Sequence, residues 1–431
     1  MSESKQIIAN DEMALKEEGE WLLSYGKYDK ALSVFLKLSQ YYPDNKSYKY
    51  YAGICYLHLP TEQQKSIEYL EESYGSSRPL EDYYFYLAKA YFLNYRFDEA
   101  IGNFKLAMNS KTTTSTNRKT ISDLIQNCKV GKHLINSYAH ERKKITNLGN
   151  PINSEFDEYA PLLGNNQNRI FFTYKGKKAR GGLQNIYGEQ DPEGNYKEDI
   201  YSTYIESDIL LEPTDLGGKV NTNGKEIAVG LSFNETQLII YKDINGGDLY
   251  ETKKDKKSWT TPTPLSGEIN SKHFEGNASL SLDGKTLFFV SDRPGGYGGT
   301  DIYKATLQND GIWGKIENLG AVINTDKNED TPFIHASGKL MYFSSKGHQN
   351  MGGYDIFSTS LIDLSWEKPT NIGYPINTTN DDKHFSVSPD GETAYFSSNR
   401  KGSLGGQDIY KVTTYNSNKI PPSLVLKGTL S

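Results

Sequence analysis

Five copies of one pattern run from Asn153 to Tyr410. An aspartate begins the last element of each copy and recurs in steps of 49, 53, 54 and 53 residues, at Asp199, Asp248, Asp301, Asp355 and Asp408. A period of this length, with several short strands in each unit, is typical of a radial β-propeller in which each copy forms one blade. The repeat therefore predicts an architecture before it predicts any function.

Each copy carries the signals of separate strands. An asparagine opens the copy, and a turn residue follows it 13 positions later. Asp283-Gly284 and Asp390-Gly391 are hairpin signals, so one strand ends before them and another begins after them. The second strand is aromatic and β-branched, as in Leu287–Val290, and the third begins at the repeat aspartate. A fourth, outer strand carries a tryptophan in three copies, at Trp259, Trp313 and Trp366.

The fifth copy lacks an outer strand of its own. Lys144–Gly149, ahead of the first copy, matches Pro369–Gly373, which is the outer strand and exit loop before the fifth. We therefore expect strand 144–149 to complete the last blade, which closes the ring and removes exposed sheet edges. The prediction is a five-bladed β-propeller over residues 141–415, followed at 416–431 by a linker and the start of a truncated β-sandwich.

Residues 1–140 follow a shorter period. Gly19, Gly53 and Ala88 are separated by 34 and 35 residues, and each lies in an apolar helical stretch. Small residues at such positions let two helices of a hairpin approach closely, so the spacing resembles tetratricopeptide repeats. We predict an N-terminal α-solenoid, capped by a helix or helix pair over Asn117–Tyr138, and hence a multidomain α and β chain.

Composition and charge narrow the function classes. The chain has 431 residues with 36% hydrophobic content, and no apolar run approaches the roughly 20 residues that span a bilayer. Residues 1–140 hold 17 basic and 17 acidic side chains, so the net charge of -6 falls on the remainder. This balance argues against a nucleic-acid partner. Cys55 and Cys128 lie in helical stretches and are predicted as buried thiols, with a disulfide as the alternative.

Catalytic motifs are missing from the sequence. It contains no Gly-x-Ser-x-Gly elbow, phosphate-binding loop or Cys-x-x-Cys pair, and His273, His335 and His384 are scattered without a nucleophile. The glycine-rich segment Gly295–Asp301 has the wrong period for a stacked calcium-binding repeat, so its glycines and aspartate are predicted to shape a strand connection. The sequence predicts that the chain is not an enzyme and has no catalytic residues.

An acidic residue stands five positions beyond each repeat asparagine, at Glu158, Glu226, Glu275, Glu329 and Asp382. Ring closure is expected to bring these five near one mouth of the central channel, where a cation such as Ca²⁺ would compensate their repulsion. The alternative is that each carboxylate accepts backbone N–H groups of its own loop or pairs with a basic residue such as Arg293 or Arg400. No other cofactor is predicted.

Two sets of residues are candidate partner-binding positions. The first blade carries about 15 additional residues before Asp199, and the insertion is basic with an aromatic tip. Its candidates are Lys177, Lys178, Arg180 and Tyr187. In the helical region Tyr48, Tyr51, Tyr83 and Tyr84 are candidates for lining a groove, although core packing explains tyrosines at helical spacing equally well.

The segments Ser291–Tyr303 and Ser397–Tyr410 resemble the WD-repeat-like propeller of envelope proteins in the OmpA family. With the helical repeats before them, nearly the whole chain resembles the PorE type of periplasmic lipoprotein of Bacteroidota, associated with type IX secretion. The resemblance implies a non-enzymatic periplasmic scaffold that links outer-membrane machinery to the cell wall and docks outer-membrane β-barrel or secretion components. The family's lipidated cysteine and peptidoglycan-binding domain have no counterpart in this sequence, so wall binding is expected only through domains absent here.

Two other function classes remain as alternatives. A propeller that binds glycans or peptidoglycan fragments would use the glycine loops and aromatic residues of the acidic face. A hydrolase or lyase would use the propeller channel.

Overall fold

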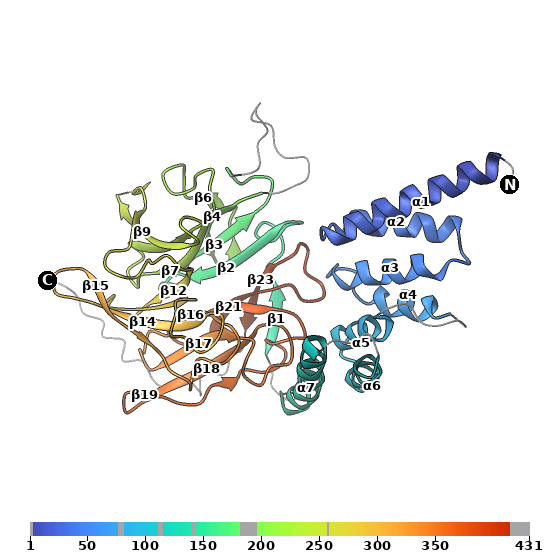
Figure 1. The fold of residues 1–431 in the computed structure, drawn as a ribbon. Helices are drawn as coiled ribbons and strands as arrows, with labels where there is room; N and C mark the ends of the chain where they lie inside the picture. The colour runs from blue at the N-terminus through green and yellow to red at the C-terminus, as the bar shows by residue number, and fades with distance from the viewer. Residues whose placement is uncertain are drawn as a thin grey trace. The chain divides into compact units, whose positions relative to one another are not determined.

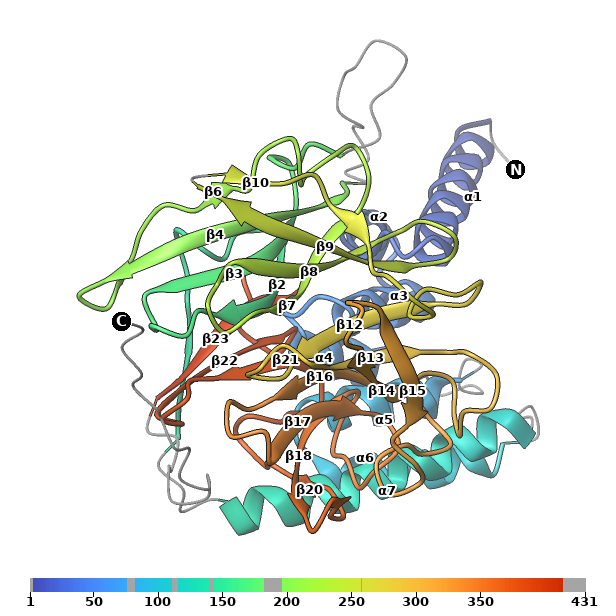
Figure 2. The same ribbon diagram turned by 90° about the vertical axis from the view of Figure 1, so that its left-hand side faces the viewer.

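The computed structural model describes residues 3–75, 82–110, 115–138, 143–181, 196–256 and 258–413. The chain divides into two compact units, Met1–Asn136 and Ser137–Ser431, the first helical and the second built of strands (Figure 1, Figure 2). The predicted boundary at residue 140 lies near this division. The predicted linker and strand at 416–431 lie outside the described residues.

Seven helices lie in the described part of the N-terminal region, and from α1 to α6 each helix packs on its neighbour along the chain. Asn45 begins α3 by accepting the Ser47 N–H, as an N-terminal cap does. Of the helices that the structure describes, none is long and apolar enough to cross a membrane. The assignment to tetratricopeptide repeats stays a prediction. The helices are α1 (Glu3–Ser24), α2 (Tyr28–Tyr41), α3 (Lys46–Leu57), α4 (Lys65–Ser73), α5 (Tyr83–Leu93), α6 (Phe97–Met108) and α7 (Ser115–Tyr138).

Small residues allow paired helices to approach closely, as their spacing suggests. A Cβ atom added at Gly19 would lie 2.8 Å from the ring of Phe35, and one added at Gly53 would lie 2.7 Å from the side chain of Leu70. Phe35 and Leu70 are both completely buried. Cys55 and Cys128 are free and buried, as predicted, and burial raises the pKa of each thiol to about 12.

Gly53→Ala should destabilise the helical unit by about 1 to 3 kcal/mol, because the new methyl group overpacks the contact with Leu70. Gly102→Ala, in the exposed part of α6, is the matched control, since nothing lies within 4 Å of its added Cβ. That change should stabilise the unit by about 0.5 to 1 kcal/mol through helix propensity. Urea unfolding followed by the helical circular dichroism signal measures both. Equal effects of the two substitutions would contradict the prediction.

The second unit is a five-bladed β-propeller, as predicted. The innermost strands of successive blades contact one another around a closed ring, in the order β2, β7, β12, β16, β21 and back to β2 (Figure 2). Blade one contains β2 (Asp157–Leu163), β3 (Arg169–Lys175), β4 (Glu198–Glu206), β5 (Ile209–Leu210) and β6 (Thr214–Asp215). Blade two contains β7 (Glu226–Leu231), β8 (Gln237–Lys242), β9 (Asp248–Asp255), β10 (Ser258–Trp259) and β11 (Thr263–Pro264). Blade three contains β12 (Glu275–Leu280), β13 (Thr286–Ser291), β14 (Asp301–Leu307) and β15 (Trp313–Asn318). Blade four contains β16 (Glu329–Ile334), β17 (Leu340–Ser345), β18 (Asp355–Ile362), β19 (Ser365–Trp366) and β20 (Thr370–Asn371).

The last blade is completed by the start of the propeller, as predicted. It contains β21 (Asp382–Val387), β22 (Thr393–Ser398) and β23 (Asp408–Thr413), with β1 (Lys144–Asn147) as its outer strand. Strand β1 pairs antiparallel with β23 from Lys144 opposite Thr413 to Asn147 opposite Tyr410. The two ends of the repeat array therefore share one sheet.

The repeat asparagine explains how each blade holds the next. Asn153, ahead of blade one, accepts the N–H of Ile409 at 3.0 Å and donates to its carbonyl at 2.8 Å, which ties blade one to blade five. The same two-way bond recurs at the other four blade junctions, where Asn221 binds Ile200, Asn270 binds Leu249, Asn324 binds Ile302 and Asn377 binds Ile356.

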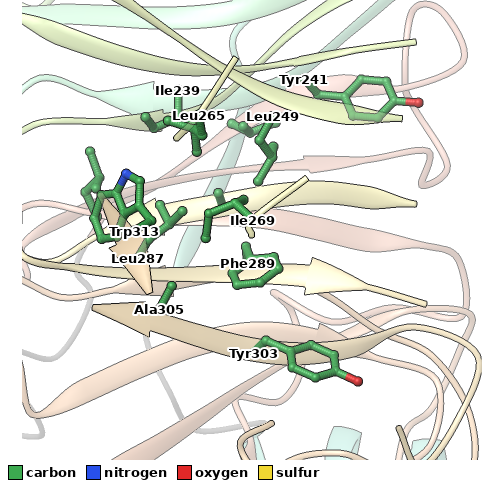
Figure 3. Packing of buried hydrophobic residues seen from close by; sticks show 13 residues of the cluster. Ile239, Tyr241, Leu249, Leu265, Ile269, Leu287, Phe289, Tyr303, Ala305 and Trp313 are labelled. Carbon is green, nitrogen blue, oxygen red and sulfur yellow. The ribbon is translucent and has the colours of Figure 1, made fainter. Parts of the chain in front are cut away.

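The apolar core of the propeller lies between blades. In the cluster of Figure 3, Ile239 and Leu249 of blade two pack with Leu287, Phe289 and Trp313 of blade three. Four further clusters of residues in the described ranges likewise each join two neighbouring blades, including blades five and one. Burial of these side chains therefore stabilises the ring as a whole.

Candidate functional site

The five repeat acids are completely buried, and each is bound within its own loop. In blade one, Ser154 donates its backbone N–H to Glu158 at 2.9 Å and its hydroxyl at 2.5 Å. The residue four positions before each of the other acids makes the same pair of bonds, from Thr222 to Glu226, Ser271 to Glu275, Thr325 to Glu329 and Thr378 to Asp382. These carboxylates therefore shape the loops that precede the inner strands.

Three of these acids also pair with a basic side chain, as the alternative interpretation proposed. Lys242 binds Glu226 at 2.6 Å, Arg293 binds Glu275 at 3.0 Å and Arg400 binds Asp382 at 2.6 Å. None of the five lines the channel cavity described below. Among the residues that the structure describes, no group of three His, Cys, Asp or Glu side chains could hold a metal ion. The prediction that the five acids meet at the channel mouth is therefore corrected. Each carboxylate is directed into its own loop by the hydrogen bonds that it accepts there.

Glu158 has no such basic partner in the described ranges, and burial raises its pKa to about 7. Its folded-state pKa therefore lies above the ordinary value of 4.5, so its contribution to stability is lost as the pH rises through about 7. As the pH rises from about 5 to about 8, we expect the free energy of unfolding of the unmodified chain to fall by about 2 to 3 kcal/mol relative to that of Glu158→Gln. This difference follows from about 1.4 kcal/mol per pKa unit. Urea unfolding of both proteins at the two pH values measures this difference. A difference independent of pH would contradict it.

The basic insertion of blade one is only partly described. Lys177 and Lys178 are exposed, whereas the guanidinium of Arg180 binds Asp215 at 2.6 Å. The Arg180 backbone N–H donates to the repeat aspartate Asp199 at 2.8 Å. Tyr187 lies outside the described residues. Arg180 therefore has a role in holding the start of the insertion against its own blade.

Two of the four candidate groove tyrosines belong to the core of the helical unit. Tyr48 is 2% exposed and donates to Glu12 at 2.5 Å, and Tyr83 is 4% exposed and donates to the Leu70 carbonyl at 3.1 Å. The interpretation of these two as groove residues is corrected, because their rings are buried between helices. Tyr51 and Tyr84 are partly exposed, and Tyr51 stacks on Phe35.

A polar cavity of about 350 Å³ lies where the five inner strands begin. The residue directly after each repeat acid lines it, and these five positions differ in every blade: Tyr159, Ile227, Gly276, Asp330 and Lys383. The acid before each position has the same loop-binding role in all blades. The blades thus repeat their framework but present five different groups to the cavity.

The inward groups of blades four and five form an ion pair. Lys383 binds Asp330 at 2.6 Å, with only 17% and 14% of the two side chains exposed. Asn277 of blade three donates to the other oxygen of Asp330 at 2.7 Å, and the Lys383 ammonium lies 4.6 Å from the centre of the Tyr354 ring. These bonds lower the pKa of Asp330 against the effect of burial, so the carboxylate is ionised.

His384 lies next to this pair, in a left-handed backbone conformation with φ of 55°. Burial and the Lys383 ammonium lower its pKa to about 3, so the imidazole is neutral. Its buried Nδ1 has no hydrogen-bond partner among the described residues. A smaller cavity of about 100 Å³ lies towards the other end of the inner strands. It shares three lining residues with the larger cavity, His384, Asn277 and Val229, which therefore lie between the two.

A second charged group lies at the edge of the larger cavity. Glu198, whose side chain is 7% exposed, has Lys225 at 3.4 Å and Lys175 at 3.8 Å. The Tyr159 hydroxyl donates to the same carboxylate at 3.4 Å. The ring of Tyr159 therefore lies between Glu198 and His384. The ring centres of Tyr159 and His384 are 5.6 Å apart.

The molecule is thus a five-bladed β-propeller protein with a charged central cavity and an N-terminal helical unit. No family model matches the chain, and no curated protein matches it. Similar solved structures include an α-L-arabinofuranosidase from Podospora anserina, with 9% identity, a TM-score of 0.38, and 62% of this chain and 93% of that one covered. A gluconolactonase from Xanthomonas campestris has 8% identity, a TM-score of 0.35, and coverage of 63% and 90%. An α-L-arabinofuranosidase from Lactobacillus brevis has 13% identity, a TM-score of 0.36, and coverage of 61% and 91%.

These comparisons correct the prediction that the chain is not an enzyme. That prediction was based on the missing catalytic motifs, whereas the similar solved structures of this fold are enzymes. A fold alone does not define a function, so the architecture gives no reason to exclude catalysis. At these identities the likeness concerns the fold alone and indicates no particular reaction.

Proposed function

We propose that the chain is a docking scaffold of the bacterial envelope, located in the periplasm and associated with the outer membrane. Its helical unit and one propeller face bind protein partners, and the partner is an outer-membrane β-barrel of a secretion or gliding machinery. The resemblance of the repeat motifs and of the domain order to the PorE type of lipoprotein supports this proposal.

The observation that carries the proposal is a pair of exposed aromatic side chains at the end of α1, Trp21 in its last turn and Tyr25 directly after it. Trp21 is 54% exposed and Tyr25 is 67% exposed, with their ring centres 4.9 Å apart. Leu22, between them in sequence, is buried in the core of the helical unit. Tryptophan and tyrosine are the residues most enriched at the energetic centres of protein interfaces. A pair of them directed to solvent therefore fits a partner's apolar pocket.

The test is cross-linked affinity purification of the chain from its native envelope. The double variant Trp21→Ser/Tyr25→Ser removes the aromatic pair, and Tyr41→Ser, which removes a 63% exposed tyrosine of α2, is the matched control. We expect the unmodified chain and the control to recover the same outer-membrane β-barrel, and the double variant to lose it. Equal recovery by all three proteins, or recovery of no barrel by any of them, would overturn the proposal.

A further inference from the structure

The five positions that line the polar cavity carry different residues, whereas the groups that build the blades repeat. The asparagine bridge, the buried acid and the apolar clusters between neighbours recur from blade to blade. The position after the acid carries Tyr, Ile, Gly, Asp and Lys in the five blades. A nearly buried ion pair at such a position costs free energy compared with apolar residues of similar size. Its presence in two of five equivalent positions therefore indicates a role in binding.

The charges around the cavity balance one another. Three lysines line it, Lys175, Lys225 and Lys383, and so do three carboxylates, Asp157, Glu198 and Asp330. An anion or cation entering the cavity would approach like charges as well as opposite ones. A ligand without net charge avoids that repulsion, and it can still accept from ammonium groups and donate to carboxylates.

Several polar groups of this cavity lack a protein partner. Lys383 has three N–H donors, and its one hydrogen bond to the described residues is to Asp330. The buried Nδ1 of His384 and the buried Oε1 of Gln407 have no partner in the described part of the chain. Polar atoms without a partner in the described part of the chain thus belong to residues that line this cavity. A hydroxyl group, which both donates and accepts, complements such a surface.

Aromatic rings form the remaining wall of the cavity. Tyr159, Tyr241 and Phe274 line it, and Tyr241 and Phe274 contact each other with ring centres 5.8 Å apart. Apolar and aromatic walls with a few converging polar groups are the usual composition of small-molecule sites, and the volume of about 350 Å³ lies in their range. A sugar ring presents both the hydroxyl groups and the flat C–H face that these walls accommodate.

We propose that this cavity is a binding site for a neutral saccharide unit, whose hydroxyl groups bond to Lys383, Asp330 and Asn277 and whose ring packs beside Tyr159. The proposal does not rest on the docking of a protein partner. The two fail independently, because one is tested with an isolated sugar and the other with an envelope extract.

Calorimetric titration of the full chain with a panel of sugars tests the site. The panel contains neutral hexoses, N-acetylhexosamines and their disaccharides, together with glucuronate and glucosamine as charged counterparts. We expect at least one neutral sugar to bind at millimolar concentration or below, and the charged counterparts to bind more weakly. Binding of a charged counterpart alone, or heat from none of the sugars, would overturn the proposal.

Three variants locate the binding. Lys383→Met combined with Asp330→Asn removes both charges together, which avoids leaving one of them unpaired, and should weaken binding at least about tenfold. Lys225→Met, on a side chain that is 31% exposed, tests the cavity edge with little risk to folding and should weaken binding by a smaller factor. Lys304→Met removes the lysine of an exposed pair with Glu317 and should leave binding unchanged. If all three variants bind the sugar as tightly as the unmodified chain does, the sugar binds elsewhere and the proposal is overturned.

Discussion

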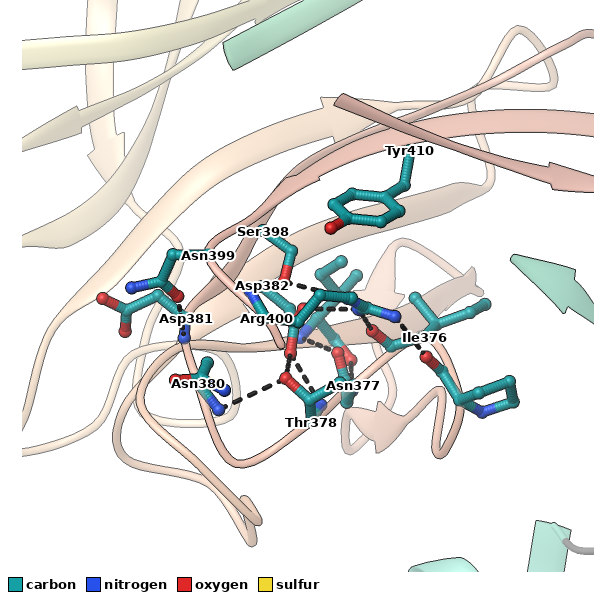
Figure 4. Close-up of polar contacts among 12 residues, drawn as sticks. Ile376, Asn377, Thr378, Asn380, Asp381, Asp382, Ser398, Asn399, Arg400 and Tyr410 are labelled. Carbon is teal, nitrogen blue, oxygen red and sulfur yellow. Dashed lines mark hydrogen bonds and ion pairs between the residues drawn. The ribbon is translucent and has the colours of Figure 1, made fainter. Parts of the chain in front are cut away.

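Replacing Arg400 with methionine is expected to lower the free energy of unfolding by about 3 to 5 kcal/mol, because the change leaves a buried carboxylate without its cation. Asp382 is completely buried, and the Arg400 guanidinium donates to it at 2.6 Å. The same guanidinium donates to the carbonyls of Pro375, at 2.8 Å, and Ile376, and to the Ser398 hydroxyl at 3.0 Å (Figure 4). Methionine preserves much of the apolar stem and removes every one of these bonds.

Lys304→Met is the matched control for this change. Lys304 binds Glu317 at 2.8 Å, but 40% and 58% of the two side chains are exposed. Water screens such a pair, so its loss should cost only about 0 to 1 kcal/mol. Urea unfolding followed by tryptophan fluorescence reports mainly on the propeller, which holds Trp259, Trp313 and Trp366 of the four tryptophans. A cost for Arg400→Met no larger than that of the control would contradict the prediction.

The propeller could be predicted in detail because its signals are local and repeated. A hairpin dipeptide such as Asp283-Gly284 fixes where two strands meet, and the aromatic run after it marks the second strand, which the structure places at Thr286–Ser291. The ring closure followed from one missing outer strand and one matching segment. The pairing of Lys144–Asn147 with β23 confirms it.

The role of the repeat acids was harder to predict, although a signal for it is present. A serine or threonine stands four positions before every one of them, from Ser154 ahead of Glu158 to Thr378 ahead of Asp382. A hydroxyl residue with a free backbone N–H at that distance closes a loop on the carboxylate, as the structure shows. A residue that makes the same contacts in every copy of the repeat has a structural role within that copy. The acids are therefore part of the blade framework.

The cavity groups were missed for the opposite reason. Asp330, Lys383 and Tyr159 occupy one position of the repeat but share no residue type, so no motif marks them. His384 was regarded as scattered because its closeness to Tyr159 arises only when blades five and one meet. The prediction that Tyr48 and Tyr83 line a groove was wrong for a related reason, since helical spacing does not distinguish a core face from a groove face. Contacts that form only when the ring closes cannot be predicted from the spacing of residues within one repeat.

Gly405→Ala should destabilise the propeller by about 3 kcal/mol or more, because it forces apart the junction that closes the ring. A Cβ atom at this position would lie 1.7 Å from the carbonyl oxygen of Phe156, in the first loop of blade one. A backbone oxygen cannot rotate away as a flexible side chain does, so the two loops must separate. The adjoining bond, from the Gln407 N–H to Asp157 at 2.8 Å, is lost in the same movement.

Gly338→Asn separates this close contact from the general cost of replacing a glycine. Gly338 has a φ of +66°, which asparagine tolerates, and nothing lies within 4 Å of its added Cβ, so the change should cost only a few tenths of a kcal/mol. Urea unfolding followed by tryptophan fluorescence compares the two variants. If the ring closes through Gly405 as the structure indicates, its variant should also expose the apolar cluster between blades five and one to a dye such as ANS, while Gly338→Asn should not. Unchanged stability and dye binding for Gly405→Ala would show that this glycine does not hold the last blade against the first.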